Sequence, residues 1–496
     1  MGSADKAFNG MLWSVVVNLV TAVYGFVVTP LLIKYFGRSE YGLIALATSI
    51  NAYMQLMDMG LSSTNVRFFS NWLTKGDIDR VKKLLQTCTV FYGIVGAINA
   101  AVLITLSFFT SDIFNVTVEQ GNVLREMLWV LSGVAIINWL TSSYGQLISA
   151  TENVAWVQKR TLFTKVAMIL VVIATLTLRL SIFQYFVLTL LAGLITLPAT
   201  IIKVKREAPY VSFKARFDKT VFKEILPYSL SIFSFGVFQF TYNNLRPVIL
   251  GIRGAIESVT DYGVISSIAA LVSMVGGVFI GALLPASSRI VANGDEEKYY
   301  RVAYKGTHYI TMILCFCAFG LMVIDEDLMM IYVGEEYMHL IPWLNVWLLL
   351  TITGNVSCIS SLILAGTNIR PLTYSSFVAA AAALIVCWFA VPRFQAGGAV
   401  MAMIAYNVLQ QLFYYIYYWP RILKINSWKI FFKTDIPFLL LGSVLVLILK
   451  NIPHFANHLI NILLFGCGFA VLYLSITYVI LDKTDREYIL SLIRRR

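Results

Sequence analysis

Apolar runs of about 20 residues recur along the whole chain and are separated by short polar segments. A run of this length can cross the hydrocarbon core of a bilayer as an α-helix. The pattern therefore predicts an all-α polytopic membrane protein with about fourteen transmembrane helices. We expect these helices at residues 11–34, 41–63, 86–109, 124–149, 161–178, 181–202, 225–250, 259–286, 304–324, 338–365, 371–391, 398–419, 435–450 and 459–481.

The motifs near the ends of these runs occur twice in the same order, which indicates an internal duplication. The segment Ser-Glu-Tyr-Gly-Leu-Ile-Ala at 39–45 returns as Thr-Asp-Tyr-Gly-Val-Ile-Ser at 260–266. Duplicated hydrophobic halves are typical of secondary transporters, whose substrate site lies at the interface between the repeats. Three further pairs, at offsets of about 215 to 218 residues, are 30–33 with 247–250, 75–77 with 293–295, and 147–150 with 362–365.

The first twelve predicted helices form two repeats of six, and the last two have no counterpart. Because six is even, both repeats start on the same side of the membrane, and we expect two parallel repeats related by an axis along the membrane normal. The predicted domains are an N-terminal six-helix bundle at 1–202, a basic cytoplasmic linker at 203–224, a C-terminal six-helix bundle at 225–424, and two extra helices with a cytoplasmic tail at 425–496.

Composition agrees with a membrane location, and the distribution of charge sets the expected topology. Apolar residues make up 58% of the chain and charged residues 13%, which is about half the charged fraction of soluble domains. The net charge of +12 would suit nucleic acid, but most of the 38 Lys and Arg residues fall in alternate loops. This distribution follows the positive-inside rule and predicts both termini in the cytoplasm. We therefore expect membrane lipids as partners and no nucleic acid.

Motifs for nucleotide binding, hydrolysis and metal binding are absent from the sequence. The chain contains no P-loop, no His-Glu-x-x-His and no Gly-x-Ser-x-Gly. It has only four histidines, and all six cysteines lie in predicted helices rather than in the clustered pairs of zinc or disulfide sites. We expect no catalytic residue, no metal and no cofactor, so the sequence favours a transporter over an enzyme.

The seventh predicted helix is the most polar and carries the strongest candidate residue, Arg246. Polar groups that face lipid are costly, so this face should line protein or a water-filled cavity. Arg246 precedes Pro247, where the freed backbone can open, and its planar guanidinium suits phosphate oxygens. It could instead extend toward the membrane surface or pair with Glu257 or Asp261. The polar face comprises Ser231, Phe235, Gln239, Tyr242, Asn243 and Arg246.

The first predicted helix carries a milder polar stripe that includes Asn18. When the two repeats are aligned so that Pro30 matches Pro247, Thr29 of the first repeat corresponds to Arg246 of the second. The two repeats are thus similar in scaffold but differ in charge, and we expect the second repeat to supply the cationic pole.

Asp58 is a carboxylate well inside the second predicted helix. A buried carboxylate is typical of a proton or sodium relay, although Asp58 could instead cap a helix or pair with Arg67. The longest predicted external loop, 325–339, contains five acidic residues and no Lys or Arg. We expect this loop to be a solvated acidic cap.

Four motifs together resemble those of one transporter family. They are Pro-Leu-Leu-Ile-x-x-Phe-Gly-Arg-x-Glu-Tyr-Gly-Leu from Pro30, then Asp58-x-Gly-Leu, Arg67, and Lys-Gly-Asp at 75–77. The family is the polysaccharide-exporter branch of the multidrug/oligosaccharidyl-lipid/polysaccharide (MOP) superfamily. Within this branch, the chain is similar to the Wzx-type flippases of O-antigen or capsule repeat units.

The resemblance implies a flippase that moves undecaprenyl-pyrophosphate-linked oligosaccharides from the cytoplasmic to the periplasmic leaflet of a bacterial inner membrane by alternating access. It also implies a cationic cavity, for which Arg246, Arg67 and Arg289 are the matching positions, and a polysaccharide polymerase as a partner. Two alternatives stay open. One is an ion-coupled small-molecule or multidrug exporter of the same fold, with Asp58 as the coupling residue. The other is a membrane-embedded glycan polymerase or ligase, which would be expected to carry a sizeable external loop.

Overall fold

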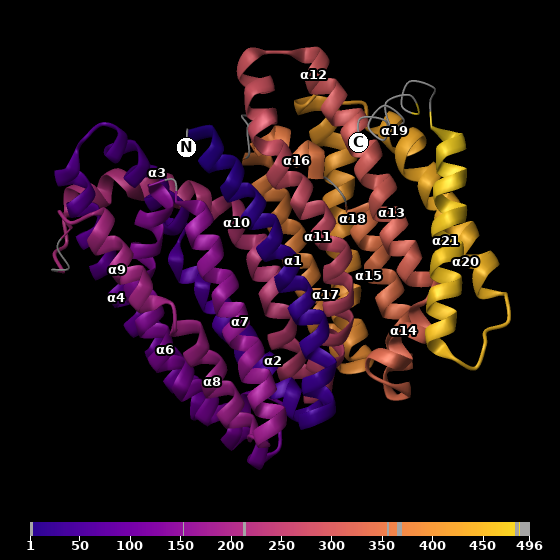
Figure 1. Cartoon of the computed structure of the whole chain (residues 1–496), viewed down its shortest axis with the longest axis horizontal. Helices are drawn as coiled ribbons and strands as arrows, with labels where there is room; N and C mark the ends of the chain where they lie inside the picture. Colours follow the sequence, from indigo (N-terminus) through magenta and orange to yellow (C-terminus); the bar gives the residue numbers. More distant parts are fainter. Residues whose placement is uncertain are drawn as a thin grey trace. The chain divides into compact units, whose positions relative to one another are not determined.

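The computed structural model describes residues 3–151, 153–211, 215–354, 357–364, 370–481 and 486, and every regular element within these ranges is a helix (Figure 1). The helices pack into two compact units. The first comprises Met1–Leu271 with Asn368–Gln410, and the second comprises Val272–Thr367 with Gln411–Arg496. The all-helical part of the sequence prediction is confirmed.

The first unit contains the helices of the first predicted repeat and several from the second. Its elements are α1 (Ser3–Phe36), α2 (Arg38–Met54), the 3₁₀-helix η1 (Gln55–Asp58), α3 (Leu61–Thr74), α4 (Ile78–Ser107), α5 (Thr110–Ile113), α6 (Val118–Ala150), α7 (Val154–Leu178), α8 (Ile182–Leu194), α9 (Leu197–Glu207), α10 (Lys219–Arg253), the first part of α11 (Ile256–Asn293), α17 (Arg370–Phe394) and most of α18 (Ala396–Phe413).

The second unit contains the rest of α11 and the elements around the last two helices. These are α12 (Glu296–Arg301), the π-helix η2 (Val302–Gly306), α13 (Thr307–Val323), α14 (Asp325–Tyr332), the 3₁₀-helix η3 (Glu335–Leu340), α15 (Ile341–Thr353), α16 (Ser357–Leu364), the π-helices η4 (Tyr414–Ile422) and η5 (Phe431–Asp435), α19 (Ser427–Ile430), α20 (Ile436–Lys450) and α21 (His458–Ile480).

The described part of the chain has eleven helices long and apolar enough to cross a membrane, or twelve if the bent helix α10 is one span. The expected number of fourteen is therefore not confirmed by the described residues. One predicted span, 41–63, is divided into α2, η1 and α3. Within the predicted span 338–365, the described residues form η3, α15 and α16, and residues 355, 356 and 365 lie outside the description. Hydropathy reports the apolar character of a segment but not a break in its backbone, which is why 41–63 was predicted as continuous.

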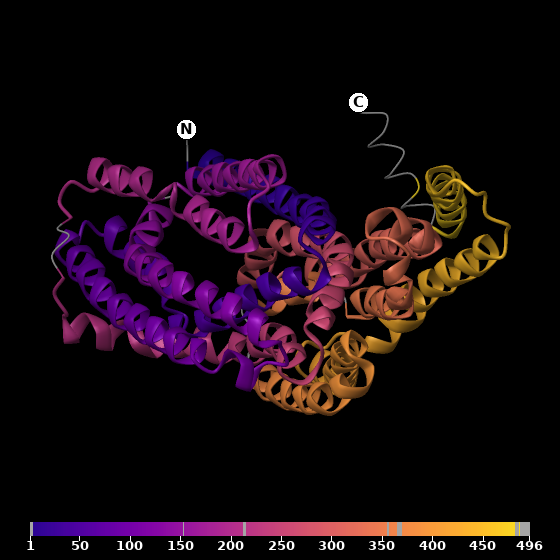
Figure 2. The same ribbon diagram turned by 90° about the horizontal axis from the view of Figure 1, so that it is seen from below.

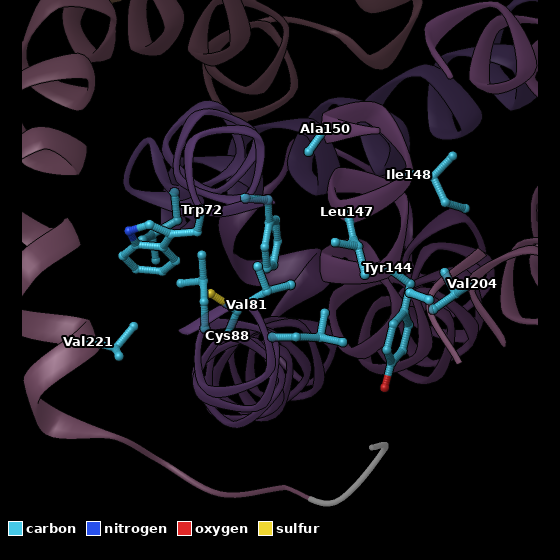
Figure 3. Close-up of a cluster of buried hydrophobic side chains, with 14 of the residues drawn as sticks. Trp72, Val81, Cys88, Tyr144, Leu147, Ile148, Ala150, Val204 and Val221 are labelled. Carbon is cyan, nitrogen blue, oxygen red and sulfur yellow. The ribbon is translucent and has the colours of Figure 1, made fainter. Parts of the chain in front are cut away.

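Helices of the first unit pack closely where small residues allow it. α4 lies along α6, α1 along α7, and α10 along α17 (Figure 1). Gly96 allows α4 to approach α6 closely, because any side chain at this position would crowd α6. A Cβ there would lie 3.3 Å from the Ile136 Cα. Toward one end of this helix pair, a buried apolar cluster includes Trp72 of α3, Cys88 of α4 and Leu147 of α6 (Figure 3). This core fixes α3, α4 and α6 relative to one another.

The repeated motifs at 75–77 and 293–295 adopt the same local structure. The glycine has a left-handed backbone in both copies, with φ of +71° at Gly76 and +63° at Gly294, a conformation that glycine tolerates without steric cost. Asp77 and Asp295 then cap the next helix, each accepting a hydrogen bond of 3.1 Å from the backbone N–H three residues later. The sequence thus encodes the same helix–turn–helix corner twice.

The two copies of the tyrosine motif, 39–45 and 260–266, contact each other in the first unit. The preceding Arg38 donates to both carboxylate oxygens of Asp261, at 2.8 Å from Nε and 2.6 Å from Nη2, a bidentate geometry that is favourable for arginine. Thr260 Oγ1 donates to the Arg38 carbonyl at 2.6 Å. Gly42 permits the close approach, because a Cβ there would lie 2.5 Å from the Ile256 carbonyl oxygen.

The acidic segment that was expected to be a solvated cap forms α14 and holds the last two helices within the second unit. α13 packs against both α20 and α21 (Figures 1 and 2). Asp325 is 1% exposed and accepts hydrogen bonds from Lys450 Nζ at 2.6 and 2.8 Å and from Asn345 Nδ2 at 2.7 Å. Burial raises the pKa of Asp325, and the nearby Lys450 opposes this effect.

Asp327 makes a second link between α14 and the last helices. His454 and His458 place their Nδ1 atoms 2.9 and 2.7 Å from the two Asp327 carboxylate oxygens, and Asn461 Nδ2 donates to Asp327 at 2.8 Å. Of the five acidic residues, three are exposed as a solvated cap requires, whereas Asp325 and Asp327 are buried. The expectation held only in part because their basic partners and Asn461 lie more than a hundred residues away in the sequence.

Candidate functional site

A partly open cavity of about 450 Å³ in the first unit is lined by both polar and apolar side chains. Its walls come from the junction of α2, η1 and α3 and from the middle parts of α4, α6 and α10. The volume falls within the range of small-molecule sites. The polar lining residues are Asn51, Gln55, Asp58, Ser62, Asn99, Asn138 and Ser142, and the aromatic ones are Trp139, Phe233 and Phe240.

The break between η1 and α3 shapes one wall of the cavity. Met59 and Gly60 have left-handed backbones, with φ of +52° and +76°. Helix α10 supports this break, because Ser229 Oγ donates to the Met59 carbonyl at 2.6 Å. A Cβ at Gly60 would lie 2.7 Å from the Ser229 carbonyl oxygen, so the close approach requires glycine. The chain therefore changes direction directly after Asp58, which lines the cavity.

The Asp58 carboxylate is held by hydrogen bonds from two other residues. Ser62 donates to it from its backbone N–H at 3.1 Å and from Oγ at 2.7 Å, and Tyr92 Oη donates at 2.8 Å. Gln146 Nε2 in turn donates to Ser62 Oγ and to Tyr92 Oη, both at 3.0 Å. Asp58 therefore caps the first turn of α3 and also lines the cavity. The cap is one of the two interpretations that the sequence left open, and the ion relay stays a prediction.

The network behind Asp58 continues into the apolar core. Asn65 Nδ2 donates to Gln146 Oε1 at 2.8 Å, and Cys88 Sγ donates to Asn65 Oδ1 at 3.2 Å. Cys88 belongs to the buried cluster of Figure 3. The Tyr92 ring stacks on Trp139, with centroids 5.6 Å apart. Satisfied buried networks rigidify their surroundings, so this wall of the cavity is positioned by the core.

Asn99 lines the cavity and carries a buried acceptor atom, Oδ1. The residue is 1% exposed, and among the described residues no donor lies within hydrogen-bond distance of its Oδ1 atom. Buried polar atoms are nearly always hydrogen-bonded, to protein, to water or to a ligand. The opposite wall is α10, which bends by 54° between Ser234 and Gly236, within the segment that lines the cavity.

Arg246 lies in an aromatic cluster of the first unit and is 4% exposed. Its guanidinium carbon is 4.4 Å from the centroid of the Tyr242 ring and 5.5 Å from that of Tyr262. Arg246 Nη2 donates to Asn243 Oδ1 at 2.9 Å, and Tyr242 stacks on Tyr406 with centroids 4.3 Å apart. In this conformation the cation faces aromatic rings rather than the cavity.

The structure distributes the other predicted site residues over several surfaces. Among the described residues that line the cavity, Asp58 is the one that sequence reasoning had selected. Arg67 is exposed on α3, with its guanidinium 4.0 Å from the centroid of the Tyr228 ring. The side chain of Arg289 lies outside the described residues. The remaining candidates are exposed on α10 or α1 and comprise Ser231, Gln239 and Asn18.

Sequence reasoning missed the amide side chains that line the cavity. Asn99 and Asn138 lie in the middle of predicted spans 86–109 and 124–149, where polar residues usually face protein or a cavity. That signal was present in the sequence, but it does not say which amides meet. Within the described residues, no group of three or more His, Cys, Asp or Glu could hold a metal ion.

Comparison with known proteins places these features in a family and a fold. The model of a family described as polysaccharide biosynthesis protein matches residues 11–342. The solved structure of the lipid II flippase MurJ in an inward closed conformation aligns with a TM-score of 0.71 at 15% identity, covering 94% of this chain and 98% of that one.

Two structures of multidrug resistance MATE family transporters of the MOP superfamily also align at 15% identity. The inward-facing one has a TM-score of 0.60 and covers 88% of this chain and 96% of its own. The outward-facing one has a TM-score of 0.50 and covers 91% and 98%. No curated protein sequence matches. The fold is therefore that of MOP superfamily transporters.

Proposed function

The chain belongs to the polysaccharide biosynthesis protein family, and from this premise we propose that it is a flippase for a polyprenyl-pyrophosphate-linked oligosaccharide. In this proposal the glycan headgroup moves from the cytoplasmic to the outer leaflet of a bacterial inner membrane, both chain termini lie in the cytoplasm, and no covalent step occurs. The product is handed to a polysaccharide polymerase outside.

The observation that carries the proposal is a cavity with polar side chains in its wall, lined in part by α4 and α6, which are long and apolar enough to cross a membrane. Hydroxyl and amide groups lose several kcal/mol each when they enter hydrocarbon without hydrogen-bond partners. The cavity offers such partners in Asn51, Gln55 and Asn138, and flat apolar walls in Trp139 and Phe240. A glycan can therefore exchange its water for protein groups while the polyprenyl chain stays in lipid.

The pyrophosphate needs a separate cationic contact in this scheme. Our candidates are the arginines selected from the sequence, Arg246 foremost, with Arg67 and Arg289. Because Arg246 is covered by tyrosine rings, its role in binding requires a second conformation in which Tyr242 moves aside. Alternating access, with one conformation open to each side, supplies such a change.

The proposed function is tested in the native host by deleting the gene. Polyprenyl-linked oligosaccharides are extracted and compared with those of the wild type and of the deletion strain complemented with the wild-type gene. We expect a complete repeat unit to accumulate and the surface glycan to disappear, with both effects reversed by complementation. An intact surface glycan without accumulation would contradict the proposal and favour the multidrug exporter of the same fold.

The driving force is a separate hypothesis, in which Asp58 couples transport to an ion gradient. Asp58 is a carboxylate that faces the cavity and accepts hydrogen bonds from Ser62 and Tyr92. Asp58→Asn keeps the acceptor oxygen and the shape but removes the charge. We expect it to lower transport and to abolish its dependence on an imposed proton or sodium gradient in proteoliposomes. Transport at the wild-type rate, with the same gradient dependence, would remove this hypothesis.

A further inference from the structure

We propose that the cavity binds the saccharide part of the ligand and selects sugars without acidic groups, namely neutral, N-acetylated or amino sugars. The proposal rests on the proposed function and specifies its substrate class. Sugars that carry a carboxylate, sulfate or phosphate are disfavoured at this site, which also separates the site from that of the pyrophosphate.

The charge of the cavity wall is the first argument. Among the described residues that line the cavity, Asp58 carries the one formal charge, and Lys, Arg and His are absent. Two like charges repel more strongly near a protein surface than in bulk water, because the effective dielectric is lower there. An acidic sugar in the cavity would meet this repulsion without a cation to offset it, whereas a protonated amino sugar would be attracted.

The balance of hydrogen-bond donors and acceptors is the second argument, and it is independent of charge. Asn99 Oδ1 is a buried acceptor that lacks a donor among the described residues. A hydroxyl, an ammonium or an acetamido N–H can donate to it, whereas an ionised carboxylate or phosphate can only accept. The atom that needs a partner is therefore satisfied by sugar hydroxyls and not by acidic groups.

Aromatic side chains supply the third feature of a saccharide site. Trp139 is positioned by stacking on Tyr92, and Trp139, Phe233 and Phe240 line the cavity. Such rings offer flat apolar surface against which the C–H face of a sugar ring can pack, while amides at the edge orient its hydroxyls. A cavity of about 450 Å³ accommodates a short piece of the glycan rather than a whole polymer.

The proposal is tested by binding of three trisaccharides of similar size to the purified full-length protein in lipid nanodiscs. The probes are neutral N,N′,N″-triacetylchitotriose, the cationic chitosan trimer and the anionic trimer of galacturonic acid, measured by calorimetric titration at low salt. We expect the neutral and cationic trimers to bind at least about tenfold more tightly than the anionic one. Equal or tighter binding of the anionic trimer, or no measurable binding of any trimer, would overturn the proposal.

A variant that adds a positive charge to the cavity wall should gain binding of the anionic trimer. Asn138 is exposed to the cavity, and we expect Asn138→Lys to strengthen binding of the anionic trimer and to weaken that of the cationic one. Asn71→Lys is the matched control, because Asn71 is exposed on α3 and does not line the cavity. Identical effects of the two substitutions would refute the site.

Asp58→Asn provides the complementary variant, since an asparagine oxygen can still accept from Ser62 and Tyr92. We expect this substitution to narrow the difference between the neutral and anionic trimers. Unchanged discrimination would count against Asp58 as its origin and overturn the charge argument. The accumulation experiment in the host has a different readout, so a cavity without this selectivity would leave the flippase proposal standing.

Discussion

At the scale of single residues, the two repeats use the same position for different chemistry. The match of Pro30 with Pro247 makes Thr29 and Arg246 equivalent, and both face the tyrosine of the repeated motif. Thr29 Oγ1 lies 3.2 Å from Tyr41 Oη, and the Arg246 guanidinium carbon lies 5.5 Å from the Tyr262 ring centroid. A hydroxyl in one half thus corresponds to a cation in the other, as the sequence had led us to expect.

Substitution of Arg246 separates its charge from its packing. If the guanidinium receives pyrophosphate, Arg246→Ala abolishes transport at normal protein abundance, and Arg246→Lys retains part of it because the charge is kept. Transport of a labelled lipid-linked oligosaccharide into inverted vesicles, normalised to the amount of protein, measures this. A cation buried against aromatic rings contributes about 2 kcal/mol to stability. Low abundance of both variants, with normal transport per molecule, would show that Arg246 only packs the tyrosine cluster.

The residue scale also shows where sequence reasoning stops. For Asp58 the sequence left two interpretations open, an ion relay and a residue that caps a helix or pairs with Arg67. Its partner Tyr92 lies 34 residues further along the chain, and Gln146, which donates to Tyr92, lies 88 residues away; nothing in the sequence brings them together with Asp58. The cavity could be located only when the helices that carry these residues were placed side by side.

At the scale of elements, the apolar pattern predicted where helices lie but not where they break. The predicted span 41–63 is divided into α2, η1 and α3 because Met59 and Gly60 leave the helical conformation. The reason is tertiary, since the break rests on the backbone of α10. The turns at 75–77 and 293–295 have a local cause instead, since the same Gly-Asp pair gives the same structure in both copies.

Two glycines with the same backbone conformation isolate the role of this break. Gly60 and Gly76 both have a positive φ, but a Cβ at Gly76 meets nothing within 4 Å. Gly76→Ala should therefore cost about 1 kcal/mol from backbone strain alone. Gly60→Ala should cost about 2 kcal/mol more, because the methyl group collides with α10. Thermal unfolding of the purified variants measures the difference, and equal losses would show that the contact with α10 can relax.

Acidification should weaken the attachment of the last two helices to α14. Although burial raises the pKa of Asp327, hydrogen bonds from Asn461, His458 and His454 outweigh this effect and lower it below its ordinary value of 3.8. A carboxylate with a lowered pKa stabilises the folded state above its unfolded pKa, and this contribution is lost as the pH falls through the folded value. We expect wild-type protein to lose more thermal stability below about pH 4 than Asp327→Asn does. Parallel pH profiles of the two proteins would contradict this.

At the scale of the whole molecule, the fold class followed from the sequence more securely than the number of spans. Periodic apolar runs and the duplicated motifs predicted a polytopic transporter, and the family and the fold agree. The orientation in the membrane rests on the distribution of Lys and Arg alone and stays a prediction. The two units of the structure cut across the predicted bundles, because α17 and most of α18 pack with the first unit.

Cysteine labelling tests the predicted orientation. Glu335 and Lys219 are both exposed, and the positive-inside rule places them on opposite sides of the membrane. In intact spheroplasts, a membrane-impermeant maleimide should label Glu335→Cys directly and Lys219→Cys only after permeabilisation, with the wild-type chain as the background. The reverse pattern would invert the topology and with it the proposed direction of transport.

The support that α10 gives to the break at Met59 and Gly60 has a consequence for biosynthesis. The residues joined by this hydrogen bond, Met59 and Ser229, are 170 positions apart. At ordinary rates of translation, of about 5 to 20 residues per second, the ribosome needs roughly ten to thirty seconds to make the intervening chain. During this interval the polar junction between α2 and α3 lacks the support of α10. Chaperones or insertases that shelter polar segments from lipid would act on this protein at that stage of its synthesis.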